Sequence, residues 1–135
     1  MGREMPHNPF APTSVLLVGM DFELAATLQK ILAGEGHRVS YEGRGASATL
    51  RNFKAPGTPD VICCGTRQQA YQRVIEQVRL SGKPVPVVVV SGKQETAEWL
   101  DALEAGASDY FAQPFDSGHI AWVIESAIRT AGTMN

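Results

Sequence analysis

The chain has 135 residues, of which 44% are hydrophobic and 19% charged, and its formal net charge is −2. This length is enough for one domain with a buried core, and the slightly negative charge argues against a nucleic-acid-binding surface built from overall charge. The longest apolar run, at 85–90, is far too short to cross a bilayer, so no membrane association is expected.

Three segments are expected. Residues 1–13 contain three prolines and no apolar core, so they are predicted to be a disordered leader rather than a signal peptide. Residues 14–131 are predicted to form the folded domain, with a short tail at 132–135. Cys63 and Cys64 are adjacent, and neighbours in a strand point to opposite faces. We therefore expect two small buried side chains rather than a disulfide or a redox pair, which fits a reducing cytoplasm.

In the first half of the chain, short apolar runs alternate with helical periodicity. Ser14–Val18 is predicted to be a buried strand. Asp21–Gly34 is predicted to be an amphipathic helix, because apolar side chains recur every three or four residues. Arg38–Glu42 is predicted to be a weaker strand, Ala46–Lys54 a short helix and Asp60–Cys64 a third strand.

The next predicted helix opens at Thr66. Gln69, three residues later, completes a possible capping box. Val74, Val78 and Leu80 are expected on the apolar side of this helix.

The last third of the chain repeats the alternation. Pro86–Ser91 is almost pure valine, and a strand that apolar must be covered on both faces. Thr96–Ala105 is predicted to be a helix and Asp109–Ala112 the fifth strand. Asp116 or Ser117 is expected to cap a final helix.

Five strands that alternate with five helices on short connections predict an α/β fold with right-handed crossovers. The expected architecture is a flavodoxin-like, three-layer α/β/α domain with a five-stranded parallel sheet in the order 2-1-3-4-5. In such a sheet, functional groups lie beyond the carboxyl ends of the strands, near the switch point between strands 1 and 3.

Several sequence strings resemble the receiver domain family of response regulators. The most specific is A-G-A-S-D-Y-F-A-Q-P-F at 105–115, which is similar to the family pattern A-G-A-x-D-Y-x-x-K-P-F. L-L-V at 16–18, P-D-V-I at 59–62 and P-V-V-V-V-S at 86–91 follow in the family's order and spacing. The resemblance covers roughly residues 15–130 and implies a domain of two-component signal transduction.

The family's chemistry is phosphoryl transfer to an aspartate after strand 3, beside a Mg²⁺ held by two acidic residues after strand 1. Matched position by position, the acidic pair falls on Gly19 and Met20, the phosphoacceptor on Gly65 and the cationic lysine on Gln113. The hydroxyl that contacts the phosphoryl group is retained as Ser91. The resemblance therefore implies a pseudo-receiver with no catalytic residue, no bound metal and no cofactor. It also implies a cis peptide bond before Pro114.

Asp21 lies one residue beyond the positions of the acidic pair, and two interpretations of its role are open. It is either the N-cap of the first helix or a surviving metal ligand. The second reading belongs to an alternative function, a receiver still phosphorylated on an atypical acid. A further alternative is a small-ligand sensor that uses the emptied pocket.

The family also uses the surface of helix 4, strand 5 and helix 5 for dimerisation or partner binding. Leu100 and Leu103 are expected to face inward from the helix at 96–105, which puts Trp99 at the edge of the buried face. Trp99 is thus either a core-edge residue or an interface anchor. The residues that map to this surface are Trp99, Tyr110, Ala112, Val123 and Ser126.

The predicted function is that of a cytoplasmic, phosphorylation-independent pseudo-receiver that binds a protein partner or a second copy. No enzymatic activity and no direct contact with nucleic acid or membrane are expected. The end of the chain directly after the last helix fits the N-terminal part of a larger regulator.

Overall fold

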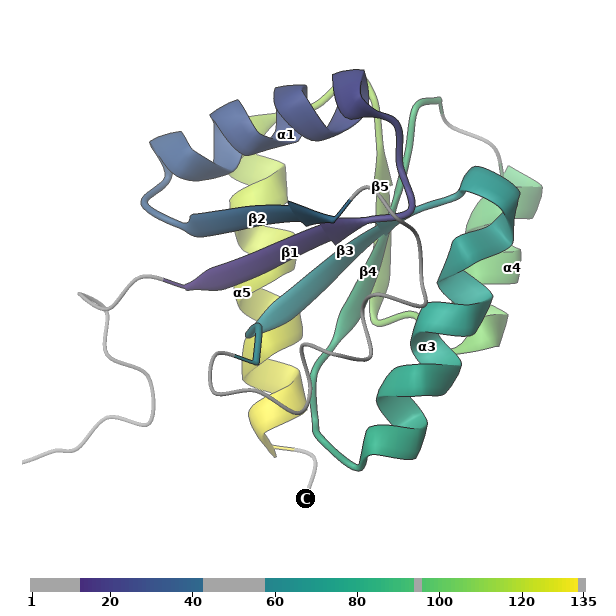
Figure 1. Cartoon of the computed structure of the whole chain (residues 1–135). Helices are drawn as coiled ribbons and strands as arrows, with labels where there is room; N and C mark the ends of the chain where they lie inside the picture. Colours follow the sequence, from purple (N-terminus) through teal and green to yellow (C-terminus); the bar gives the residue numbers. More distant parts are fainter. Residues whose placement is uncertain (1–12, 43–57, 94–95, 134–135) are drawn as a thin grey trace, which may run out of the picture.

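The computed structural model describes residues 13–42, 58–93 and 96–133. Its centre is a parallel five-stranded sheet in the order β2-β1-β3-β4-β5 (Figure 1). The strands are β1 (Ser14–Val18), β2 (Arg38–Glu42), β3 (Val61–Gly65), β4 (Val87–Ser91) and β5 (Asp109–Ala112). The predicted helix Ala46–Lys54, most of the predicted leader and the end of the tail lie outside the described residues.

Helices cover both faces of the sheet. The two helices α1 (Phe22–Gly34) and α5 (Ser117–Thr133) pack on one face, and α3 (Ala70–Ser81) and α4 (Thr96–Ala105) pack on the other (Figure 1). This arrangement confirms the predicted flavodoxin-like fold and strand order. In the part of the chain that is described, no helix is both long and apolar enough to cross a membrane.

The two central strands are buried on both sides, as their apolar sequences predict. Every residue of β3 and β4 is buried. Cys63 packs with the cluster under α1 and α5, whereas Cys64 packs with the cluster under α3 and α4. Both cysteines are free thiols on opposite faces of the sheet, which confirms the prediction that they do not pair.

The start of α1 also agrees with the sequence. The Asp21 side chain accepts a hydrogen bond from the backbone N–H of Leu24 at 2.9 Å, so Asp21 is the N-cap. The periodic residues Ala25, Leu28 and Leu32 form the buried side of the helix. Asp21 thus satisfies one of the backbone donors that a helix start leaves without an intrahelical partner.

The predicted capping box at Thr66 is wrong. Thr66 precedes the 3₁₀ turn η1 (Arg67–Gln69), and its side chain makes no capping hydrogen bond. Gln69 has a left-handed backbone, with φ of 54°, directly before α3. The turn and this left-handed residue redirect the chain so that α3 begins at Ala70 and not at Thr66. Leu80, which we expected on the apolar side, is 71% exposed.

The predicted orientation of α4 is also wrong. Leu100 and Leu103 were expected to face inward, but they are 50% and 37% exposed. Among the ten described residues of α4, Ala102 alone is buried. The sequence offers apolar residues on two sides of this helix, and the small side chain of Ala102 lets the helix approach the sheet most closely.

Hydrogen bonds from two tyrosines hold α4 in place, since the helix has no broad apolar face against the sheet. The hydroxyl of Tyr71, on α3, donates a hydrogen bond to the carboxylate of Asp101. The hydroxyl of Tyr110, on β5, donates to Oε1 of Glu98 at 3.1 Å. Polar contacts to both neighbouring elements therefore position this helix.

Burial makes a prediction for the thiols. It raises the pKa of Cys63 and Cys64 to about 12, and the thiolate is the reactive form. At pH 8, iodoacetamide should leave both thiols unmodified in the folded chain and alkylate both in denaturant, as read by intact mass. The folded-state pKa lies above the ordinary value of 9.0, so folding favours the protonated thiols. Their contribution to the free energy of unfolding is therefore complete at pH 8 and is lost only as the pH rises above about 9.

The exposed side chain of Ser40 on β2 provides the control. In a Ser40→Cys variant, the folded chain should gain one alkyl group under the same conditions. Alkylation of the folded wild-type chain at a rate similar to that of the new thiol would contradict the burial of Cys63 and Cys64.

Candidate functional site

The loops that follow β1, β3, β4 and β5 meet at the carboxyl edge of the sheet, where the sequence predicts the site. They surround a cavity of about 460 Å³. The lining residues are Gly19, Met20, Asp21, Glu23, Leu24, Thr27, Thr66, Arg67, Gly92 and Gln113. The structure thus brings four of the six predicted pocket positions to the cavity wall, while Gly65 and Ser91 lie buried next to it.

Gly65 is in close contact with the loop after β1. A Cβ atom on Gly65 would lie 2.4 Å from the carbonyl oxygen of Gly19 and 2.7 Å from the Cβ of Met20. Such distances are too short for real Cβ atoms, so any side chain at this position requires the backbone to move. Gly19 has φ of +73°, a left-handed conformation that glycine adopts without strain.

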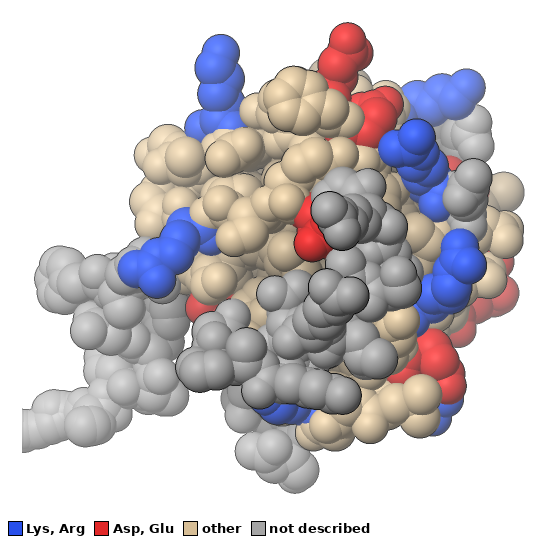
Figure 2. All heavy atoms as spheres, viewed as in Figure 1, with Lys and Arg blue, Asp and Glu red and all other residues tan. Residues whose placement is uncertain are grey.

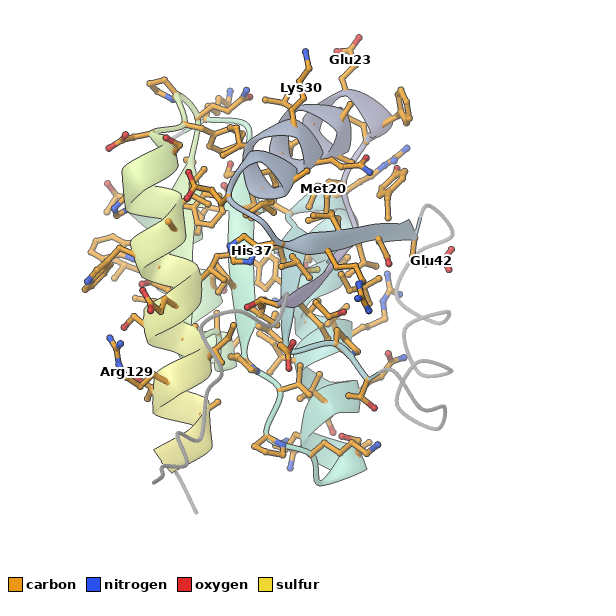
Figure 3. All side chains as sticks on the ribbon, turned by 90° about the vertical axis from the view of Figure 1, so that its left-hand side faces the viewer. Met20, Glu23, Lys30, His37, Glu42 and Arg129 are labelled. Atoms are coloured by element: carbon orange, nitrogen blue, oxygen red, sulfur yellow. The ribbon has the colours of Figure 1, made fainter. Side chains whose placement is uncertain are left out.

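The space next to Gly65 is filled because Met20 is a core residue. Met20 is 3% exposed and belongs to the same core cluster as Leu28, and Figure 3 shows it beneath α1. The backbone carbonyl of Met20 accepts a hydrogen bond from the hydroxyl of Tyr41 at 2.9 Å. The loop is therefore anchored by both its side chain and its backbone.

Ser91 and Gln113 lie on the other side of the cavity. The hydroxyl of Ser91 donates to the carbonyl of Lys93 at 2.7 Å and accepts from the N–H of Lys93 at 3.3 Å. The backbone N–H of Gln113 donates to the carbonyl of Ser91 at 3.1 Å. The peptide bond between Gln113 and Pro114 is cis, as predicted. The Ser91 hydroxyl is thus bonded within its own loop.

The charged groups of the cavity do not form a magnesium site. Of the described lining residues, Asp21 and Glu23 are the carboxylates. One Asp21 oxygen is bonded to the start of α1, and Glu23 projects outward from that helix (Figure 3). Mg²⁺ requires near-octahedral oxygen ligands, and no three His, Cys, Asp or Glu side chains in the described ranges converge on a metal position. The described residues thus offer no cluster of acidic ligands for this ion beyond the two carboxylates of the cavity.

A second hollow lies between α4 and α5 above β5, with a volume of about 840 Å³. We call it the α4–α5 groove. Its lining residues are Thr96, Trp99, Asp109, Tyr110, Phe111, Ala112, Pro114, Phe115, Asp116, His119, Ile120 and Trp122. Trp99 and Trp122 are 42% and 59% exposed, so the two tryptophans of the chain stand on the two helices that border the groove.

The groove agrees only in part with the predicted interaction face. Trp99, Tyr110 and Ala112 line it, and Ser126 is half-buried outside it. Val123 is 1% exposed and belongs to the core, so its assignment to a contact surface is wrong. The periodicity of α5 could have shown this, because Val123 and its neighbour Ile124 continue the apolar series of that helix.

Sequence reasoning missed several other groove residues. His119 and Trp122 are three residues apart, the spacing that puts two side chains on one side of a helix. Both are exposed and both line the groove. The aromatic Phe115 completes this end of the groove, where its ring meets that of Phe111 edge-on at 5.7 Å between centroids.

Charges are dispersed over the described part of the face that Figure 2 shows. On the face shown in Figure 2, Lys and Arg side chains are spread over several parts of the molecule and are interspersed with Asp and Glu. This face therefore offers no continuous basic patch of the kind that contacts a phosphate backbone.

Known proteins match most of the chain. The transcriptional regulatory protein PrrA of Mycobacterium leprae (strain TN) is 31% identical over 120 residues, which are 87% of this chain and 51% of that protein. ZraR of Salmonella typhimurium, also a transcriptional regulatory protein, is 25% identical over 118 residues, or 84% of this chain and 26% of that protein. The chain thus spans about half of the length of PrrA and about a quarter of that of ZraR. No family model matches it.

Solved structures match the fold. NtrX from Brucella abortus, in complex with ADP, superposes with a TM-score of 0.77 at 21% identity and covers 90% of this chain and 27% of that one. A putative response regulator from Chloroflexus aurantiacus superposes with a TM-score of 0.76 at 23% identity, covering 88% of this chain and 99% of that one. These likenesses support the fold assignment.

The contact at Gly65 gives a stability prediction. Gly65→Ala and Gly65→Asp should each lower the free energy of unfolding by about 1–3 kcal/mol, because the loop after β1 must move to admit a Cβ atom. Urea denaturation measures this change. Gly34→Ala is the matched control, since a Cβ there has no neighbour within 4 Å. If Gly65→Ala left the unfolding midpoint at the wild-type value, the close contact would be refuted.

Proposed function

Because the chain is homologous over most of its length to the receiver domains of response regulators, we propose that it is a cytoplasmic pseudo-receiver. It signals without phosphorylation by binding a protein partner or a second copy. The contact is made by the α4–β5–α5 surface, which comprises the α4–α5 groove and the adjoining residue Ser126.

The observation that carries the loss of phosphorylation is the close contact at Gly65. A phosphoacceptor needs a carboxylate at the end of β3, but Gly65 has no side chain and its Cβ position lies 2.4 Å from the Gly19 carbonyl oxygen. Met20 fills a metal-ligand position with a buried thioether, which is a poor ligand for a hard cation. Gln113 is neutral, and with no anion to neutralise, a lysine there would lack its partner.

The observation that supports protein contact is the exposure of aromatic side chains on α4 and α5. Receiver domains of response regulators interact with other proteins or dimerise. Trp99 and Trp122 are large, exposed and close to an aromatic floor, and side chains of this kind contribute most of the free energy at many interfaces. The scaffold that presents this surface is intact, although the phosphorylation residues have been replaced.

Since the chain spans about half of PrrA and about a quarter of ZraR, we propose that the domain is the N-terminal part of a larger regulator. Binding at the α4–β5–α5 surface would then control the activity of the remainder of that protein. The neighbouring coding sequence tests this directly.

A small-ligand sensor is the second candidate. The 460 Å³ cavity at the former phosphorylation site supports it, because Arg67 and Gln113 line the cavity and supply donors for an anionic or polar metabolite. A thermal-shift screen against anionic metabolites would favour this function if one compound raised the melting temperature of the wild-type chain but not of an Arg67→Ala variant.

The phosphorylation test uses acetyl phosphate with Mg²⁺. We expect no mass increase of one phosphoryl group on the intact chain, because no carboxylate occupies the phosphoacceptor position. A receiver domain with the complete acidic set, treated in parallel, is the positive control. Stoichiometric labelling of Asp21 or of any other aspartate would overturn the proposal.

The contact test replaces Trp99. Trp99→Ala should weaken self-association or partner binding by about 2 kcal/mol if Trp99 is an anchor of the interface. Its melting temperature should fall little, since 42% of the side chain is already exposed. Leu80→Ala, at an exposed position on α3, is the control for loss of exposed apolar surface. A large drop in melting temperature with unchanged association would instead assign Trp99 to the core.

A further inference from the structure

The α4–α5 groove combines aromatic walls with acidic ends. Trp99 comes from α4 and Trp122 from α5, and Tyr110 lies on β5 between them. Indole rings are the best aromatic partners for cations, which they attract through the negative potential of their faces. The exposed parts of the two tryptophans therefore suit both the aliphatic stem and the charged end of a lysine or arginine side chain.

The carboxylates of the groove stand at opposite ends of its floor. Asp109 is the first residue of β5, and Asp116 lies after the turn that follows its last residue, Ala112. Oδ1 of Asp109 accepts a hydrogen bond from the N–H of Tyr110 at 2.8 Å. This bond orients the carboxylate, and its second oxygen can accept from a ligand.

His119 is the one basic side chain beside these acids in the described lining of the groove. Among the described residues that line it, none is a lysine or an arginine. Arg129 lies on α5, seven residues beyond Trp122 and outside the lining, and its side chain points away from the helix (Figure 3). The groove is thus an acidic channel with aromatic sides.

From this chemistry we infer that the α4–α5 groove receives a basic segment of a partner protein, whose lysine or arginine side chains meet Asp109 and Asp116 between Trp99 and Trp122. This inference rests on the proposed role of the α4–β5–α5 surface and names the chemistry of its occupant. An apolar occupant would bury two carboxylates without compensation, which is unfavourable.

A second copy of the chain is the less favourable occupant. A two-fold symmetric contact uses the same patch on both subunits, so the acidic groove of one copy would face the acidic groove of the other. Like charges opposed across an interface cost free energy. A basic segment instead brings charges that complement the groove.

The test uses the protein's own tryptophans. The chain contains two, and both line the groove, so their fluorescence reports on its occupation. The probe is an amphipathic peptide of leucine and lysine, about four helical turns long, and the control peptide has glutamate in place of every lysine. The lysine peptide should shift the emission in a saturable way, whereas the glutamate peptide should not.

Two matched double variants assign the site. Asp109→Asn with Asp116→Asn should weaken binding of the lysine peptide at least tenfold, while asparagine preserves the hydrogen-bond acceptor at 109 and the capping ability at 116. Glu35→Gln with Glu76→Gln also removes two charges, but from exposed positions just after α1 and on α3, outside the lining of the groove and of the cavity. The affinity of this control variant for the lysine peptide should remain within about twofold of wild type, since its substituted positions lie apart from the groove.

The outcomes separate this inference from the proposed function. Equal binding of both peptides, equal loss in both double variants, or no response to the lysine peptide up to about 1 mM would overturn the inference of a basic occupant. If self-association that depends on Trp99 were then found by sedimentation, the proposed contact surface would stand with a second copy as its occupant. If neither peptide binding nor self-association were found, both the inference of a basic occupant and the proposed contact surface would fail.

Discussion

The contact between Gly19 and Gly65 determines how the carboxyl edge of the sheet is built. The Gly19 carbonyl lies so close to the end of β3 that Gly65 has no room for a Cβ atom. The same carbonyl accepts a hydrogen bond from the backbone N–H of Arg67 at 3.3 Å. The chain after β1 and the turn after β3 are therefore joined through one backbone atom. With Met20 packed inward and its carbonyl bonded to Tyr41, this edge is a packed part of the core.

That arrangement explains why the substitutions at this edge are mutually consistent. A buried methionine needs a neighbour without a side chain, and Gly65 supplies it. A neutral Gln113 suits a cavity in which no carboxylate follows β3. The lining of the α4–α5 groove does not include these positions, so the proposed loss of phosphorylation would leave the proposed contact surface in place.

The sequence predicted the sheet well because its strands are either uniformly apolar or end at clear turn residues. It predicted the N-cap at Asp21 because a helix start leaves a local chemical signature. It failed for α4, where Leu100 and Leu103 suggested one buried side and Ala102 marked the actual one, because periodicity does not report how closely a helix approaches its neighbours. It could not predict the groove, since Trp99 and Trp122 are far apart in sequence and border one groove only because α4 and α5 flank the same edge strand, β5.

The attachment of α4 has a consequence for local stability. The strands β3 and β4 are held by backbone ladders and buried on both faces, whereas α4 contributes Ala102 to the core and depends on its bonds to Tyr71 and Tyr110. Regions with few buried apolar contacts open at a lower free energy than the whole domain unfolds. The amides of α4 should therefore exchange with deuterium before those of β3 and β4. An occupant of the adjoining groove would slow that exchange, because it closes the helix against the rest of the domain.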